Sequence, residues 1–232
     1  TKSRSRRPAS SLPSGAMWNS SNAAASRAAG ADAMLGDVRA LAAQMGAGGR
    51  SLLPAAATLA AVGTVPALRE FAARYVRETL AASEWPVILQ AWQLAREGKA
   101  RELIALDQEW TRRNAAAAFA EASFRVGRRQ LGQLRPLRHE RVVLRYLAAL
   151  EAGEARGWHP VVYGVTLAVF NLPLRQGLVN FGAQTLGGFV DATEQAHRLP
   201  AAECQALLEE ATAQMPALLP PLPGATAFQA CH

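Results

Sequence analysis

The chain has 232 residues, of which 50% are hydrophobic, and its formal net charge is +7. A chain of this length can bury one sizeable core, and its richness in Ala and Leu favours helices over sheet. The longest apolar stretch, Pro160 to Leu174, is interrupted by Asn171 and Pro173 and is shorter than the roughly 20 residues of a bilayer span, which argues against a transmembrane helix. Two cysteines without a Cys-x-x-Cys pair favour neither a disulfide framework nor a closed metal site, and indicate a reducing compartment.

Residues 1–50 differ in kind from the rest of the chain. They carry seven basic and two acidic side chains, have no acidic residue before Asp32, and lack a sustained apolar period. Such a composition is typical of a disordered or targeting-like basic segment. We therefore expect two parts, this segment and an all-helical domain over residues 51–232.

Helical periodicity becomes clear from Pro66 onward. The expected fold class is all-α, a single helical domain of about eight to ten helices preceded by the disordered segment. The pattern predicts five helices before residue 153: one beginning at Pro66, one capped by Ser83, one over Lys99–Trp110, one capped by Asn114 and reaching about Leu134, and one over Arg138–Ala152. Pro200 opens the last helix, Ala201–Met215, and the Pro-rich stretch 216–223 ends regular structure.

The most informative stretch is residues 158–195, which the pattern predicts as three linked helices. Pro160 suits a first helical turn, and the apolar run after it predicts a buried rod. Asn171-Leu172-Pro173 then permits a new start. The following segment carries Gly177, Gly182, Gly187 and Gly188 among Phe181, Leu186 and Phe189. We expect these glycine-bearing helices to form a homodimer or hetero-complex interface, because their apolar area exceeds what one short helix can bury.

The positive charge is unevenly distributed. Residues 112–145 hold nine basic and two acidic side chains, whereas residues 146–232 hold three basic and seven acidic ones. A basic helical nucleic-acid-binding protein is therefore one alternative, but no helix-turn-helix pattern is recognisable and the last third is acidic. A helical ligand-binding protein is the other, although few polar groups are available to line its pocket. The polarised charge favours a protein partner instead.

Catalytic motifs are missing from the sequence. It has no GxxxxGK[ST], HExxH or GxSxG pattern, and its only lysines are Lys2 and Lys99. The four histidines are not at the i, i+4 spacing that binds zinc from one helix. We therefore expect no enzyme, no bound cofactor and no metal ligands in this chain.

Three short motifs nevertheless stand in a definite order. They are Glu121-Ala-Ser-Phe-Arg-Val-Gly-Arg-Arg-Gln-Leu131; then His159-Pro160 with Gly164 and Leu172-Pro173; and last Ala230-Cys231-His232. Together they resemble the urease accessory protein UreF family over roughly residues 59–232. Leu12-Pro13-Ser14-Gly15 resembles an early family motif, but Asn19 replaces its His; Leu53-Pro54 is a rival alignment. The family's tail beyond the His matched by His232 has no counterpart here.

The resemblance implies an all-α scaffold that acts in urease maturation. Such a protein joins the GTPase UreG to the platform protein UreD (also called UreH) and helps deliver nickel to apo-urease. It is expected to be a cytoplasmic homodimer that acts as a chaperone of nickel insertion, while its partners handle nickel and GTP. Organelle targeting by the first segment is a further expectation.

Seven residues are candidates for the partner interface: Glu121, Ser123, Arg128, His159, Tyr163, Gln184 and His232. Several keep two readings. His159 can make a helix-start hydrogen bond or contact a partner or a metal, and Gln184 can cross-link helices or face a partner. Arg128, with Arg125 and Arg129, forms either a solvated face or a surface for an acidic partner, since the Arg fork pairs well with carboxylates. Ser123 and Gly127 form a small-xxx-small pair that admits a close neighbour.

Overall fold

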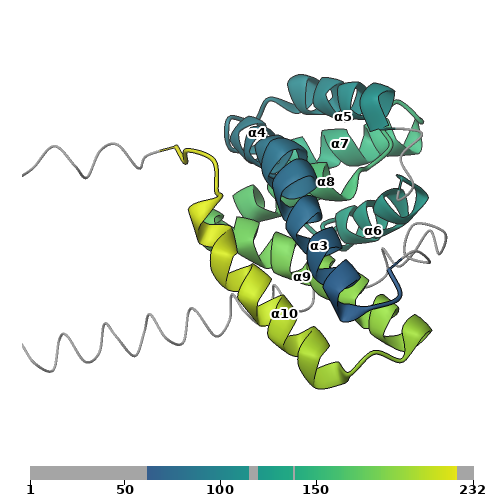
Figure 1. Ribbon diagram of the computed structural model, residues 1–232. Helices are drawn as coiled ribbons and strands as arrows, with labels where there is room; N and C mark the ends of the chain where they lie inside the picture. Colours follow the sequence, from purple (N-terminus) through teal and green to yellow (C-terminus); the bar gives the residue numbers. More distant parts are fainter. Residues whose placement is uncertain (1–61, 115–119, 138, 224–232) are drawn as a thin grey trace, which may run out of the picture. The chain divides into compact units, whose positions relative to one another are not determined.

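The computed structural model describes residues 62–114, 120–137 and 139–223 (Figure 1). Every regular element within these ranges is helical, so the predicted all-α fold class is confirmed there. The expected basic segment 1–50 and the candidate His232 lie outside the described residues, as do Arg138 and residues 115–119. No helix among the described residues is both long and apolar enough to cross a bilayer.

The first described helices form one continuous run. Thr64 caps α3 (Val65–Arg74), its hydroxyl oxygen accepting from the Ala67 N–H at 3.3 Å, and the run continues through the π-helix η2 (Tyr75–Glu84) into α4 (Trp85–Arg96). The predicted break and cap at Ser83 are therefore wrong. Ser83 lies inside η2, where the i→i+5 pattern keeps the backbone hydrogen-bonded without a new helix start.

The next helix boundary also differs from the prediction. Helix α5 (Ala100–Asn114) extends past Trp110, and the Asn114 side chain donates to the Trp110 carbonyl at 3.0 Å, inside its own last turn. Asn114 is thus the last described residue of α5, and the residues that it was predicted to cap lie outside the described structure. The described part of that helix is α6 (Ala120–Gln133), and α7 (Arg141–Glu151) comes after it.

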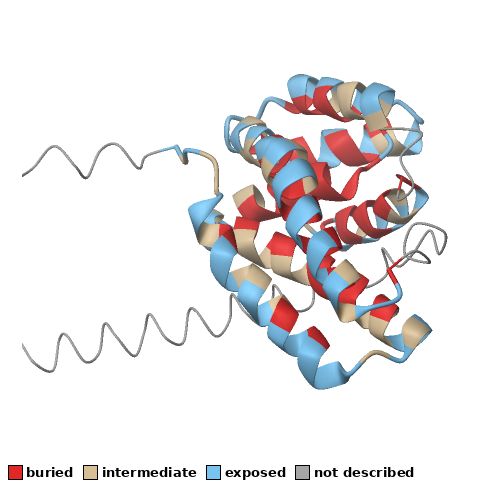
Figure 2. Ribbon diagram, viewed as in Figure 1, coloured by how far each residue is buried: buried red, intermediate tan, exposed pale blue. Residues whose placement is uncertain are grey.

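Helix α8 (His159–Val169) is the buried rod that its apolar sequence predicts, with nine of its residues buried. It packs against α4 and α6. An added Cβ at Gly164 would lie 2.5 Å from the Ile88 carbonyl oxygen, so only glycine allows α8 this close to α4. The paired helices α4 and α8 contribute to both hydrophobic clusters of the domain: one shared with α3, η2, α9 and α10, the other with α5, α6 and α7 (Figure 2).

Residues 158–195 form two helices, not the predicted three. Asn171 takes a left-handed conformation, with φ of 49°, and α9 (Leu174–His197) then runs unbroken for 24 residues. Its glycines do not interrupt it because neighbouring helices bury them. Gly182, for example, faces the Met215 sulfur and the Leu80 side chain.

This burial corrects the reasoning behind the predicted glycine-lined interface. Phe181, Leu186 and Phe189 are at most 2% exposed, in the core that α9 shares with α3 and η2. They leave no apolar surface for a partner, and a bulky residue at Gly182 would disturb the protein's own packing.

The chain of described elements ends with α10 (Ala201–Gln214) and the short 3-10 turn η3 (Met215–Ala217). Helix α10 lies along α9 (Figure 1). If the α3–η2–α4 run is counted as one helix, residues 62–223 contain seven helices in their described parts, slightly fewer than the eight to ten predicted.

Candidate functional site

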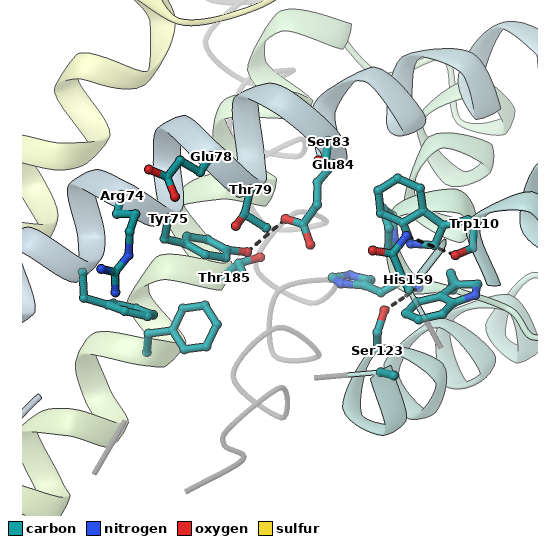
Figure 3. A pocket seen from close by; sticks show the side chains of 16 residues that line it. Arg74, Tyr75, Glu78, Thr79, Ser83, Glu84, Trp110, Ser123, His159 and Thr185 are labelled. Carbon is teal, nitrogen blue, oxygen red and sulfur yellow. Dashed lines mark hydrogen bonds between the residues drawn. The ribbon is translucent and has the colours of Figure 1, made fainter. Parts of the chain in front are cut away.

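A cavity of about 470 Å³ lies where η2 passes the first turn of α8 (Figure 3). Residues from α3, α5, α6 and α9 complete its wall. The polar side chains include Tyr75, Glu84, Ser123 and His159, which stand among aromatic rings. This size lies within the roughly 300–1,000 Å³ of small-ligand pockets.

The π-helical geometry brings two of these polar groups together. The Tyr75 hydroxyl donates to a Glu84 carboxyl oxygen at 2.9 Å, although the two residues are nine positions apart on one helix. Nine residues of an ordinary α-helix make about two and a half turns and would place them on opposite faces. The wider turn of η2 places them on the same face, toward the cavity (Figure 3).

Burial changes the proton affinity of this pair. Desolvation raises the pKa of Glu84 to about 7, and the hydrogen bond from Tyr75 only partly opposes this rise. The pKa of Tyr75 lies well above its usual value because of burial first and the nearby Glu84 second. Glu84 is half-buried and has no cationic partner among the described residues. It can therefore gain or lose a proton near neutral pH.

His159 supplies an unusual side chain to the same cavity. It is only 3% exposed, and neither ring nitrogen has a hydrogen-bond partner among the described residues. Burial, with the charge of Arg129 as a smaller cause, lowers the pKa of His159 to about 3. The imidazole is therefore neutral at pH 7, with one donor and one acceptor nitrogen.

The main chain of His159 is firmly held, in contrast to its side chain. Its N–H donates to the Ser123 hydroxyl oxygen at 3.2 Å. One turn along α6, an added Cβ at Gly127 would lie 2.0 Å from the Gly157 carbonyl oxygen. The small pair Ser123 and Gly127 thus admits a close neighbour, as predicted, and that neighbour is the backbone entering α8. For His159, the hydrogen bond at the helix start is observed.

A buried carboxylate fixes the loop before His159. Asp107 on α5 is 0% exposed, and its carboxylate accepts from the Tyr146 hydroxyl and from three successive backbone N–H groups, those of residues 156–158, at 2.6–3.2 Å. These four hydrogen bonds offset the cost of burying the charge. Sequence reasoning missed Asp107, because a lone Asp on an amphipathic helix reads as a solvent-facing residue.

Two other candidates lie away from this cavity's lining. The Tyr163 hydroxyl donates to the Gly177 carbonyl at 3.0 Å, and burial raises the pKa of the phenol. That bond connects α8 to α9 inside the core. Gln184 is half-buried on α9. A partner contact by either residue stays a prediction.

The remaining described candidates lie on the surface of α6. Glu121 is exposed in its first turn, and Arg128 is exposed two turns later, with its Nε donating to the Arg156 carbonyl at 3.1 Å. Arg125 and Arg129 are exposed beside it on the same helix. The structure therefore brings Ser123 and His159 together inside and leaves Glu121 and Arg128 outside.

Metal binding by His159 finds little support in its surroundings. In the part of the chain that the structure describes, no three His, Cys, Asp or Glu side chains gather as a metal site would require. The cavity can instead hold a hydrogen-bonding ligand, because its polar groups are spaced among aromatic walls and both ring nitrogens of His159 are unpaired within the described structure.

Comparison with known proteins gives a consistent result. Residues 62–212 match the model of the UreF family, which covers more than half of the chain. The chain is also similar to the urease accessory protein UreF of Sporosarcina pasteurii, at 27% identity over 114 residues. The aligned part is 49% of this chain and 56% of that protein, so the chain spans about half the length of the curated relative it matches.

Proposed function

Since the chain belongs to the UreF family, we propose that it is a non-catalytic urease accessory protein that works as a scaffold. It holds the GTPase UreG against the platform protein UreD, and so couples nucleotide hydrolysis to nickel delivery into apo-urease. Nickel and GTP are bound by the partners. The proposal includes a homodimer and a cytoplasmic location, as the family resemblance implies.

The family membership of residues 62–212 is the observation that carries this proposal. The exposed side of α6 adds a surface on which a partner can bind, with Arg125, Arg128 and Arg129 accessible along one helix. Guanidinium groups in this arrangement suit a carboxylate-rich protein surface. Coupling to a GTPase requires only that this surface prefers one nucleotide state of the partner.

A pull-down tests the proposal directly. The tagged full chain is mixed with UreG and UreD in the presence of Ni²⁺ and either GTP or GDP, and retained proteins are quantified. We expect both partners to be retained, with UreG retention dependent on the nucleotide. Retention of neither protein would overturn the proposal.

A matched pair of variants locates the contact. Arg128→Glu reverses a charge on the exposed side of α6, whereas Arg175→Glu reverses one at the exposed start of α9. We expect the Arg128 variant to lose at least tenfold in affinity for an acidic partner, or about 1.4 kcal/mol. The Arg175 variant is expected to bind as the unmodified chain does. An equal loss of affinity in the two variants would show that α6 does not form the interface.

Homodimer formation needs its own measurement, because the glycines expected at the dimer interface are buried. Sedimentation equilibrium from micromolar to millimolar concentration gives the mass in solution. A monomer throughout would remove the dimer from the proposal without affecting the pull-down result.

A further inference from the structure

No hydrogen bond within the described structure accounts for the buried polar ring of His159. Its ring is buried beside Tyr163 and Phe181, yet both nitrogens lack hydrogen-bond partners within the described structure. Leaving a buried polar group unpaired costs about 1–3 kcal/mol. A partner that enters the cavity can recover that cost.

The chemistry of the cavity selects the kind of guest. Neutral His159 offers a lone pair, and the Glu84 carboxyl offers two oxygens, one of which already accepts from Tyr75. A second carboxyl, that of Glu78, also lines the wall. An anionic guest would meet two acidic groups, whereas a cation with several N–H donors would meet acceptors.

The aromatic walls favour a planar cation as the ligand. Trp110, Trp158, Phe71 and Phe189 all line the cavity. A planar cation can lie against such rings, and Arg guanidinium groups stack on aromatic faces in this way. An ammonium group would gain the charge attraction but not the planar stacking.

From these three features together, the unpaired imidazole, the carboxyl groups and the aromatic walls, we propose that the cavity binds a guanidinium group. The guest is either free arginine or a similar small molecule, or an arginine side chain presented by another protein. In both cases the same atoms recognise it: Glu84 and His159 accept from its N–H groups, and the rings cover its faces. This inference does not depend on the proposed scaffold function.

The other charges near the cavity set its pH response. Arg74 also lines the wall, at the opposite end from Trp110 and Ser123 (Figure 3), and Arg129 on α6 is close enough to lower the pKa of His159. Both oppose a cation, so binding requires the charged form of Glu84. Because burial raises the pKa of Glu84 to about 7, affinity should rise about tenfold from pH 6 to pH 8.

Calorimetric titration of the full chain tests the proposal. The probes are L-arginine and L-citrulline, whose side chain has nearly the same shape but no charge, each at pH 6 and pH 8. We expect arginine to bind more tightly at pH 8 and citrulline to bind at least tenfold more weakly than arginine. Equal binding of the two probes, or no binding of arginine in any form, would overturn the proposal.

Two variants connect the binding to the cavity. Glu84→Gln should weaken arginine binding at least tenfold and abolish its pH dependence, while Glu70→Gln, an exposed change on the same continuous helix, should leave both unchanged. Circular dichroism confirms that each variant is folded. Unchanged arginine binding in folded Glu84→Gln would also overturn the proposal.

A third probe, the capped peptide Gly-Arg-Gly, identifies the source of the guanidinium. Tighter binding of the peptide than of free arginine indicates an arginine side chain of a partner protein. Tighter binding of free arginine indicates a small molecule. Both outcomes support a guanidinium site, and the absence of binding by both probes contradicts it.

Discussion

The backbone and the side chain of His159 lie in contrasting environments a few ångströms apart. The loop before it is saturated with hydrogen bonds, because Asp107 accepts from residues 156–158 and Ser123 accepts from His159 itself. The side chain, in contrast, lines the cavity, and neither of its nitrogens is paired within the described part of the chain. The hydrogen bonds of the backbone stabilise the fold, and the two ring nitrogens of the side chain are left able to bind a ligand. One motif residue therefore serves both purposes through different atoms.

The largest effect on stability is expected in the hydrogen-bonded loop before His159. Asp107→Ala leaves the Tyr146 hydroxyl and three buried N–H groups without their acceptor, and should lower the free energy of unfolding by about 4 kcal/mol. Chemical denaturation measures this change. Tyr146→Phe, which removes one donor only, is the control and should cost about 1 kcal/mol. A loss under 1 kcal/mol for Asp107→Ala would show that the loop does not depend on its carboxylate.

The next effect concerns the close approach of α6 to the same loop. Gly127→Ala places a Cβ 2.0 Å from the Gly157 carbonyl oxygen, so the backbone must move, at a cost of about 3 kcal/mol. Gly132→Ala on the same helix has nothing within 4 Å of the new Cβ and should raise stability by up to about 1 kcal/mol. Thermal unfolding compares the two variants. Similar melting temperatures would contradict the close contact.

A smaller effect is expected on the cavity side, and it depends on pH. The folded-state pKa of Glu84, about 7, lies above its ordinary value of 4.5, so its contribution to stability is present below pH 4.5 and is lost as pH rises through 7. The free energy of unfolding of Glu84→Gln should therefore exceed that of the parent by about 1 kcal/mol at pH 8. This figure is reduced to allow for solvent screening of the half-exposed carboxyl. Denaturation at pH 5 and pH 8 measures it. A variant less stable than the parent at pH 8 would reverse the sign.

The smallest effect at neutral pH belongs to His159 itself. His159→Phe removes no observed side-chain hydrogen bond, and the gain from removing the unpaired nitrogens is opposed by the strain of fitting a larger ring, so stability should change by less than about 1 kcal/mol. Below pH 6.5 the parent should lose stability as pH falls toward 3, since burial lowers the pKa of His159 to about 3 and charging the ring becomes costly. The Phe variant should lack that part of the loss. A loss of several kcal/mol at pH 7 would mean that the ring is needed for folding.

A similar contrast separates the features of the fold that the sequence predicts correctly from those that it does not. Periodicity predicted α8 as a buried rod, and the small pair Ser123 and Gly127 predicted a close neighbour, because both follow from local pattern. The sequence pattern gave wrong predictions where residues distant in the chain determine a helix boundary or the burial of a side chain. Ser83 has the residue type of a cap but lies inside a continuous helix. The glycines of α9 were expected at an interface, but side chains of α8, η2, α10 and η3 cover Gly177, Gly182 and Gly187.

The candidate site was reachable only in part. Ser123 and His159 were named from their motifs, whereas Tyr75 and Glu84 were assigned to separate helices. No 3.6-residue pattern predicts that residues nine apart meet. Asp107 was missed because its partners, the Tyr146 hydroxyl and three backbone N–H groups, lie 39 to 51 residues away and leave no pattern in the residues around it.

The π-helical segment also has a consequence for comparing relatives. In an α-helix, a phenol and a carboxyl reach the same face when they are seven residues apart, since seven residues make about two turns. In η2 the separation is nine. A relative that builds this pair on an ordinary helix must therefore carry two residues fewer between them. A two-residue gap within positions 75–84 of an alignment would then mark a change of helix type with the cavity kept, whereas a substitution of Tyr75 or Glu84 without a gap would mark its loss.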